Sequence, residues 1–184
     1  MYLATLREAV RQGPFVVLDT ETTGLHGEVC QIAILSSEGE ILLDQLVRPS
    51  EHIPQDAYRI HGISDEEVRS SPVWGDVQPR VLAGIFGKTV IVYNAKFNRH
   101  ILHNSAERAG LPKTNWKELS TWVCAMEAFA EFYGDWNEYH QSYRWQKLSF
   151  AAEYCNIPVL SAHQALADCI MTLGIARAMY DGAK

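Results

Sequence analysis

The sequence predicts a single α/β domain in which a mixed β-sheet is flanked by helices on both sides. Three apolar runs follow one another closely near the N-terminus, a spacing that is typical of consecutive strands joined by short turns. From residue 64 onward, helical patterns alternate with short apolar runs, as expected when further strands are added through helical crossovers. No internal repeat or low-complexity linker interrupts the chain, so residues 1–184 are expected to form one domain.

The expected elements follow from local patterns along the chain. A capping box at Ser64 and Glu67 predicts the start of a short helix that ends at Pro72. Gly110 and Pro112 mark the end of a longer helix. The other expected helices are 2–10, 77–86, 95–110, 122–132, 148–155 and 164–180. The expected strands are 15–20, 29–36, 41–47, 89–93 and 116–119, with a loop over 48–63.

Composition narrows the class of protein. No apolar run has the length of a membrane span or of a signal-peptide core, and the four cysteines are scattered without a C-x-x-C pair. We therefore expect a cytoplasmic protein with reduced thiols, no disulfide framework, no zinc site and no membrane partner. The formal net charge of −6 argues against a protein that coats polyanions, but it leaves room for a site where metal ions supply positive charge.

Two carboxylates at the end of the first strand are the main candidates for chemistry. Asp19 and Glu21 are two positions apart, so in a strand their side chains project from the same face. Two converging acids repel each other unless a cation lies between them, and Mg²⁺ or Mn²⁺ prefers such oxygen ligands. The alternative is an exposed strand end whose acids meet only water.

Two further groups of polar residues lie downstream. Residues 93–102 run from the end of a strand into a helix, and His163 and Asp168 surround the start of the last helix. Five positions of a continuous helix pass a full turn by about 140°, so His163 and Asp168 share one site only if His163 lies at the helix boundary. The alternative is a surface histidine and a solvated acid.

In this order and spacing, the three groups resemble the motifs of the DEDDh family, the DnaQ-like 3′–5′ exonucleases. Asp19-Thr-Glu21-Thr-Thr-Gly24-Leu25 is similar to the first motif, Tyr93-Asn94-Ala95-Lys96-Phe97 to the start of the second, and His163-x-Ala165-Leu166-x-Asp168 to the third. The resemblance covers about residues 14–180. It implies a ribonuclease H-like fold with a mixed five-stranded sheet. It also implies metal-dependent release of nucleoside monophosphates from 3′ ends of single-stranded or frayed DNA, with RNA as an open alternative.

The resemblance further implies residue roles. Asp19 would bridge two Mg²⁺ ions, for which Mn²⁺ would substitute, and Glu21 and Asp168 would complete the first ion's ligands. His163 would take the proton from the attacking water. Three of the candidate substrate contacts named below have a structural alternative. Leu25 is equally explained as an ordinary core leucine, His61 as a capping or loop-packing histidine, and Phe97 as a core aromatic. The residues expected to contact substrate are Thr22, Thr23, Gly24, Leu25, His61, Asn94 and Phe97.

Asn98 departs from the family pattern, which has an aspartate at this position. By the resemblance, position 98 supports the second metal ion, so we expect a folded, substrate-binding protein with little nuclease activity. The intact neighbouring motifs favour a deliberate or recent replacement over a natural variant that is slow or no longer a nuclease. A non-catalytic nucleic-acid-binding or assembly module on the same fold is the alternative function.

The aromatic segment 133–147 allows two interpretations. Its aromatic side chains, with Arg144 and Lys147, are expected either to stack single-stranded bases and contact phosphate, or to anchor a loop onto the fold or onto a partner. Lys96 and Arg99 are candidates for phosphate contacts, with solvated helix positions as the default. A polymerase or another replication or repair protein is expected as a partner by analogy alone, and no sequence feature indicates an oligomeric state.

Overall fold

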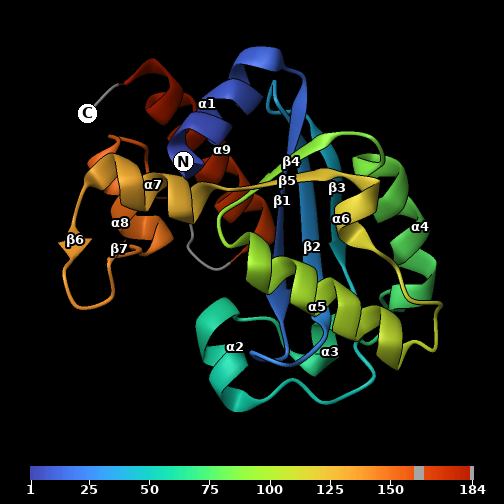
Figure 1. The fold of residues 1–184 in the computed structure, drawn as a ribbon. Helices are drawn as coiled ribbons and strands as arrows, with labels where there is room; N and C mark the ends of the chain where they lie inside the picture. The colour runs from blue at the N-terminus through green and yellow to red at the C-terminus, as the bar shows by residue number, and fades with distance from the viewer. Residues whose placement is uncertain (160–163, 183–184) are drawn as a thin grey trace.

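A mixed five-stranded sheet forms the centre of the fold, as described by a computed structural model for residues 1–159 and 164–182. The strand order is β3-β2-β1-β4-β5 (Figure 1). Strand β1 (Phe15–Thr22) pairs antiparallel with β2 (Val29–Ser36), and β2 pairs antiparallel with β3 (Ile41–Leu46). On its other side, β1 is parallel to β4 (Thr89–Val92), which is parallel to β5 (Thr121–Cys124). The expected sheet is confirmed.

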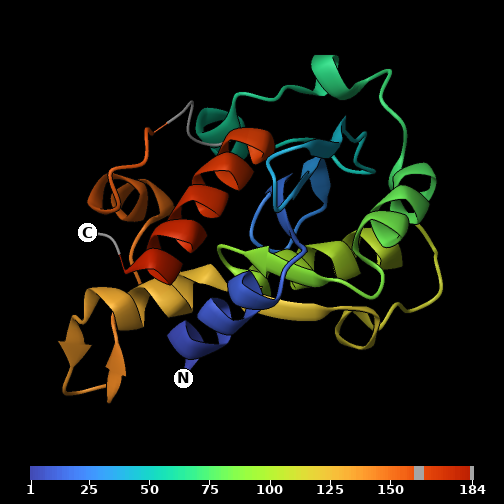
Figure 2. The same ribbon diagram turned by 90° about the horizontal axis from the view of Figure 1, so that it is seen from above.

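Helices cover both faces of this sheet (Figure 2). One face is covered by α1 (Tyr2–Gln12), α7 (Ala125–Tyr133), α8 (Leu148–Tyr154) and α9 (Ala165–Asp181), with α9 packed against β1 and β2. The other face is covered by α4 (Trp74–Ile85) and α5 (Ala95–Arg108). Within the described ranges, no helix is long and apolar enough to cross a membrane.

The alternation of side chains along β1 directs its two acids toward α9. Val16 and Leu18 belong to the core beneath α4 and α5, whereas Phe15 and Val17 belong to the core beneath α1, α7 and α9. Because successive side chains of a strand point to opposite faces, Asp19 and Glu21 continue the register of Phe15 and Val17. The hydrophobic pattern that buries β1 therefore also aims both carboxylates at the side of the sheet where α9 begins.

The region before the edge strand β5 differs from the prediction. Residues 116–119 were expected to form a strand, but they form the short helix α6 (Trp116–Leu119). The strand lies just after it, as β5 (Thr121–Cys124), where the helix 122–132 was expected to begin. Every residue of β5 pairs with a residue of β4. Local propensity did not reveal this pairing because its partner strand lies about 30 positions earlier in the chain.

Two short helices and a hairpin complete the described chain. Helix α3 (Asp65–Val68) begins with the predicted capping box, in which the Ser64 and Glu67 side chains each accept a hydrogen bond from the other residue's backbone. Helix α2 (Gln55–His61) lies within the expected loop, so that prediction was wrong for these seven residues. Its signals were Pro54 just before the first turn and Gly62 in the left-handed conformation at its end. The aromatic segment forms a hairpin of β6 (Trp136–Asn137) and β7 (Ser142–Tyr143).

Candidate active site

Three carboxylates from distant parts of the chain converge at one end of β1. Asp19 and Glu21 come from the strand itself, and Asp168 comes from the first turn of α9. One ligand oxygen of each lies within 4.8 Å of those of the other two. Glu21 is only 7% exposed, while Asp19 and Asp168 are partly buried. The spacing in the sequence and the packing of α9 on the sheet thus create one compact cluster of acids.

The electrostatics of this cluster favour a cation. Burial, followed by repulsion from Asp168, raises the pKa of Glu21 to about 8. Burial and repulsion from both neighbouring acids raise the pKa of Asp19 well above its usual range. The donor set consists entirely of carboxylate oxygens, which suits Mg²⁺ or Mn²⁺. The residues therefore fit a divalent metal ion, whose charge would remove the repulsion that now favours their protonated forms.

Asn98 lies beside the cluster with its amide fully engaged. The side chain is 2% exposed, its Oδ1 accepts a hydrogen bond from the Thr20 hydroxyl at 2.8 Å, and its Nδ2 donates to the Asn94 carbonyl at 3.3 Å. A side-chain hydrogen bond from Asn98 also lowers the pKa of Asp19, opposing the effect of burial. Position 98 thus contacts the carboxylate cluster, and it does so through an amide that has both a donor and an acceptor partner.

The loop after β1 is held by a clamp of charged residues that sequence reasoning did not find. The Thr23 hydroxyl accepts from the Glu28 backbone N–H at 2.8 Å and donates to Glu51. Arg108, at the end of α5, forms ion pairs with Glu51 and Glu28. Ser50 donates to Glu28 at 2.6 Å from its hydroxyl. These partners come from three separate segments (residues 23–28, 50–51 and 108), so no local pattern identifies them.

Close packing inside this loop predicts a strong effect of a single methyl group. A Cβ added to Gly27 would lie 2.8 Å from the Gly24 nitrogen and would also overlap the Thr23 side chain. We expect Gly27→Ala to lower 3′-end binding at least about tenfold by displacing Thr23 from its clamp, because close-packed backbone has no room to yield. Gly75→Ala is the matched control, since its Cβ meets nothing within 4 Å and alanine favours helix α4. Equal binding by both variants, measured by fluorescence anisotropy, would contradict a role for this loop.

The remaining predicted substrate residues lie around the same loop and at the start of α5. Leu25 is 75% exposed, which excludes its assignment as a core leucine. His61 is buried; its Nδ1 accepts from the Ile63 N–H at 3.0 Å, so Nε2 of the neutral ring donates to the Thr22 carbonyl at 3.2 Å. Asn94 caps α5 by accepting from the Phe97 N–H at 3.2 Å, and Phe97 packs against the core. Their contacts with substrate stay predictions, and His163 lies outside the described residues.

Gln31 connects the sheet to the first residue of α9. It stands opposite Glu21 in the register of β1 and β2, and its Oε1 accepts from the Ala165 N–H at 3.2 Å. Its Nε2 donates to Asp44 at 3.0 Å. Because Asp168 lies one turn after Ala165, this hydrogen bond is one of the contacts that hold the start of α9, and with it the third carboxylate, beside the sheet.

Removal of the Gln31 amide is therefore expected to weaken metal binding. We predict that Gln31→Leu lowers the Mn²⁺ affinity about 10–100-fold, the range seen when partners of metal ligands are lost. Isothermal titration calorimetry measures this directly. Gln45→Leu is a control on the neighbouring strand, because Gln45 bonds to Arg80 and Leu46 and not to α9. An unchanged affinity in Gln31→Leu would show that α9 is positioned without this contact.

Comparison with known proteins places the site in a family. The RNase T family model, described as an exonuclease, matches residues 16–176, which include all three carboxylates and Asn98. The chain belongs to this exonuclease family. The exonuclease is 38% identical over 174 residues to the uncharacterized exonuclease CP81 of Escherichia phage 186, with 91% of this chain and 88% of the relative covered.

Three further matches have more informative names. The exonuclease is 28% identical over 163 residues to exodeoxyribonuclease 10 of Escherichia coli (strain K12), covering 86% of this chain and 65% of the relative. The solved structure of exonuclease X in complex with 5′ overhanging duplex DNA matches with a TM-score of 0.68 and 25% identity, covering 91% and 92% of the two chains. The match to the DNA polymerase III epsilon subunit of Rickettsia typhi spans 51% of that protein's length. The resemblance to DnaQ-like 3′–5′ exonucleases, and the fold it implied, are confirmed.

Proposed function

We propose that this exonuclease is a metal-dependent enzyme of the DEDDh class, which releases nucleoside monophosphates from 3′ ends of single-stranded or frayed DNA, and that Asn98 impairs it. The observation that carries the proposal is the convergence of Asp19, Glu21 and Asp168 to within 4.8 Å of one another. Membership of the exonuclease family supplies the reaction class, and the carboxylate cluster supplies a place for the cations that phosphodiester hydrolysis needs.

The three carboxylates and His163 have different roles in the proposed hydrolysis. Asp19, Glu21 and Asp168 would hold two divalent cations, Mg²⁺ or Mn²⁺, which when bound lower the pKa of the attacking water and stabilise the leaving 3′ oxygen. His163, two positions before the first residue of α9, would accept the proton from that water, a contribution of about 10²–10⁴ in rate. Glu21 would also accept a hydrogen bond from the terminal 3′-hydroxyl. A 3′-phosphorylated end has no hydroxyl to donate, so such an end would be a poor substrate.

The loop that follows β1 provides the binding surface for the terminal nucleotide in this proposal. Thr22, Thr23 and Gly24 would hold the sugar, with the loop kept in place by His61 and by the Glu28–Glu51–Arg108 clamp. The exposed Leu25 would wedge against the last bases. DNA is favoured as substrate because relatives named for deoxyribonuclease activity and for a DNA complex match most of this chain. The matches to polymerase III subunits support a polymerase or another replication or repair protein as partner.

A non-catalytic role is the second candidate function, and the surroundings of Asn98 favour it. The amide donates to a carbonyl and accepts from a hydroxyl, so asparagine suits this position better than an ionised aspartate would in the absence of metal. In that case the same fold would hold a 3′ end, or take part in an assembly, without cutting. The two candidates differ in whether an aspartate at position 98 produces cleavage.

The test is 3′ trimming of labelled oligonucleotides by the chain with Asn98→Asp. With 5′-labelled single-stranded DNA and Mg²⁺ or Mn²⁺, we expect a ladder that shortens from the 3′ end, and nucleoside 5′-monophosphates as the product. EDTA, or the additional change His163→Ala, should abolish the ladder. Matching RNA and 3′-phosphorylated DNA establish which polymer and which end are used. A protein that binds 3′ ends but leaves them uncut after Asn98→Asp would favour the non-catalytic role.

A further inference from the structure

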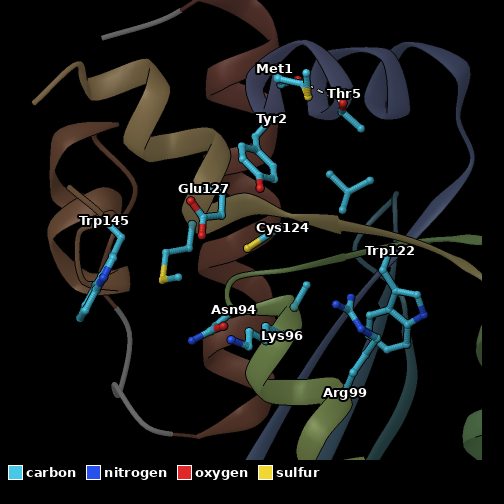
Figure 3. A pocket seen from close by; sticks show the side chains of 13 residues that line it. Met1, Tyr2, Thr5, Asn94, Lys96, Arg99, Trp122, Cys124, Glu127 and Trp145 are labelled. Carbon is cyan, nitrogen blue, oxygen red and sulfur yellow. Dashed lines mark hydrogen bonds between the residues drawn. The ribbon is translucent and has the colours of Figure 1, made fainter. Parts of the chain in front are cut away.

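A cleft leads away from the carboxylate cluster toward α1 and β5. Asp168 borders a cavity of about 410 Å³ together with Trp145 and Lys147. Next to it lies a cavity of about 650 Å³, bordered by Lys96 and Arg99 of α5 and by residues of α1, β5 and α7 (Figure 3). The residues that line both cavities are Asn94, Met126 and Trp145. The two cavities therefore form one continuous depression, here called the cleft.

Three cations on the cleft walls have no counterion among the described residues. Lys96, Arg99 and Lys147 form no ion pair and no side-chain hydrogen bond there. Among the described residues, four other arginines are paired with carboxylates (Arg11, Arg69, Arg108 and Arg144), and four more bond to carbonyl or amide oxygens (Arg7, Arg48, Arg80 and Arg177). Free cations gathered in one depression beside a phosphodiester site indicate that an anionic ligand passes through it.

Arg99 is the most informative of the three cations. Its guanidinium lies 5.4 Å from the centre of the Trp122 ring, and burial lowers its pKa. Glu127 borders the same cavity but forms no ion pair with Arg99 or Lys96 within the described part of the chain. A phosphate would supply the counterion that this partly buried guanidinium lacks, and the fork of Arg donors suits phosphate oxygens.

Trp145 provides an aromatic surface between the two cavities. Trp145 comes just after the β6–β7 hairpin in the chain, and its side chain is 64% exposed, an unusually high exposure for a tryptophan. Figure 3 shows it on the opposite side of the cavity from Arg99 and Trp122. Exposed aromatic rings beside free cations are the combination by which proteins hold single-stranded nucleic acid, because every base has a face that can stack.

We propose that the cleft binds the single DNA strand on the 5′ side of the reacting nucleotide, with Trp145 stacking a base and Lys96 and Arg99 contacting phosphates. This inference rests on the proposed function. A strand whose 3′ terminal nucleotide lies at Asp19, Glu21 and Asp168 extends in the 5′ direction alone, so it needs a path that starts at these carboxylates. The cleft starts at Asp168, carries the free cations and has the exposed ring between its two parts.

The first measurement is the binding of 5′-fluorescein-labelled dT₁₂ in Ca²⁺, followed by anisotropy over a range of salt concentrations. Trp145→Ala is expected to raise the dissociation constant about tenfold, and Trp145→Phe to retain most of the affinity because it keeps a stacking face. Lys96→Ala with Arg99→Ala should lower the magnitude of the salt slope by about 1.4, since each single-strand phosphate contact contributes about 0.7. Binding of thymidine 5′-monophosphate should not change.

Matched control variants distinguish an effect of the cleft from the general effect of losing positive charge or an exposed aromatic ring. Tyr139→Ala removes an 89% exposed aromatic residue from the same hairpin, and Lys113→Ala with Lys117→Ala removes two cations that lie outside the cleft. These variants should bind dT₁₂ with unchanged affinity and slope. Unchanged affinity and slope in the cleft variants would overturn the inference. The inference would also be overturned if the cleft variants lost affinity only for blunt duplex DNA and bound dT₁₂ normally.

A second substrate makes failure of the cleft distinguishable from failure of the nuclease proposal. The p-nitrophenyl ester of thymidine 5′-monophosphate has a single nucleotide and no DNA strand on its 5′ side, so it tests hydrolysis without a ligand long enough to fill the cleft. If the Asn98→Asp protein hydrolyses the ester while the cleft substitutions leave the affinity for dT₁₂ unchanged, the cleft inference is wrong and the nuclease proposal is supported. If dT₁₂ binding depends on Trp145 and Arg99 but the ester is never hydrolysed, the cleft stands and the nuclease fails.

Discussion

Asn98→Asp is expected to increase the rate of 3′ trimming by at least about 10–100-fold, the loss typical of a missing group in a metal shell. The present amide donates to the Asn94 carbonyl through Nδ2, a contact that an ionised carboxylate cannot make. An aspartate at this position would keep the Thr20 hydrogen bond and direct its second oxygen toward cations held by the other three acids. The fourth carboxylate would also compensate more of the 4+ charge of two divalent ions.

The gain should be accompanied by a change in metal binding that a structural effect would not produce. Mn²⁺ titration of the Asn98→Asp protein should show tighter binding of the second ion, and the additional change Asp19→Asn should remove the trimming activity. Asn137→Asp adds the same charge in the hairpin, where the side chain only accepts from the Tyr139 and His140 N–H groups, and should leave the rate unchanged. Tighter Mn²⁺ binding without any trimming would assign the chain to the non-catalytic role.

The metal-free protein is expected to become less stable as the pH rises from about 5 to 8. The pKa of Glu21 is about 8 in the folded state, and the pKa of Asp19 is also raised, so the folded protein binds more protons than the unfolded chain in this window. The free energy of unfolding therefore falls with increasing pH, because the slope follows the difference in bound protons between the two states. Below the ordinary pKa of a carboxylate both states are protonated and the dependence disappears.

Thermal unfolding with EDTA across pH 5–8.5 measures this dependence. Excess Mn²⁺ should raise the midpoint most at high pH, where the three carboxylates are ionised and repel one another. Glu21→Gln removes the titrating group and should flatten the EDTA profile, whereas Glu118→Gln on α6 should not. An EDTA profile that keeps its slope in Glu21→Gln would mean that other groups control the stability.

Local sequence patterns predicted the parts of the fold that depend on residues close together in the chain. The apolar run of β1 carries Asp19 and Glu21 in a register that its own burial determines, so both the strand and its acids were found. The capping box of α3 was likewise found because its two partners are three positions apart. In both cases the atoms that interact are near neighbours in the sequence.

Features that depend on distant partners were missed or misplaced. The strand β5 exists because β4 offers it hydrogen bonds, and its own residues gave no signal that separated it from the start of α7. The clamp of Glu28, Glu51 and Arg108 joins three charged residues that are individually ordinary in the sequence. Gln31 also becomes informative only when α9 is known to begin beside it.

The wide separation of the three carboxylates has a consequence for the order of events during synthesis. Asp19 and Glu21 leave the ribosome about 150 positions before Asp168, and they gain their third partner when α9 packs on β1 and β2. The cluster is therefore incomplete while the nascent chain is still growing. The helix that completes the hydrophobic core also completes the carboxylate cluster, so under the proposed function an unfinished chain would not yet hold the metal ions that cutting requires.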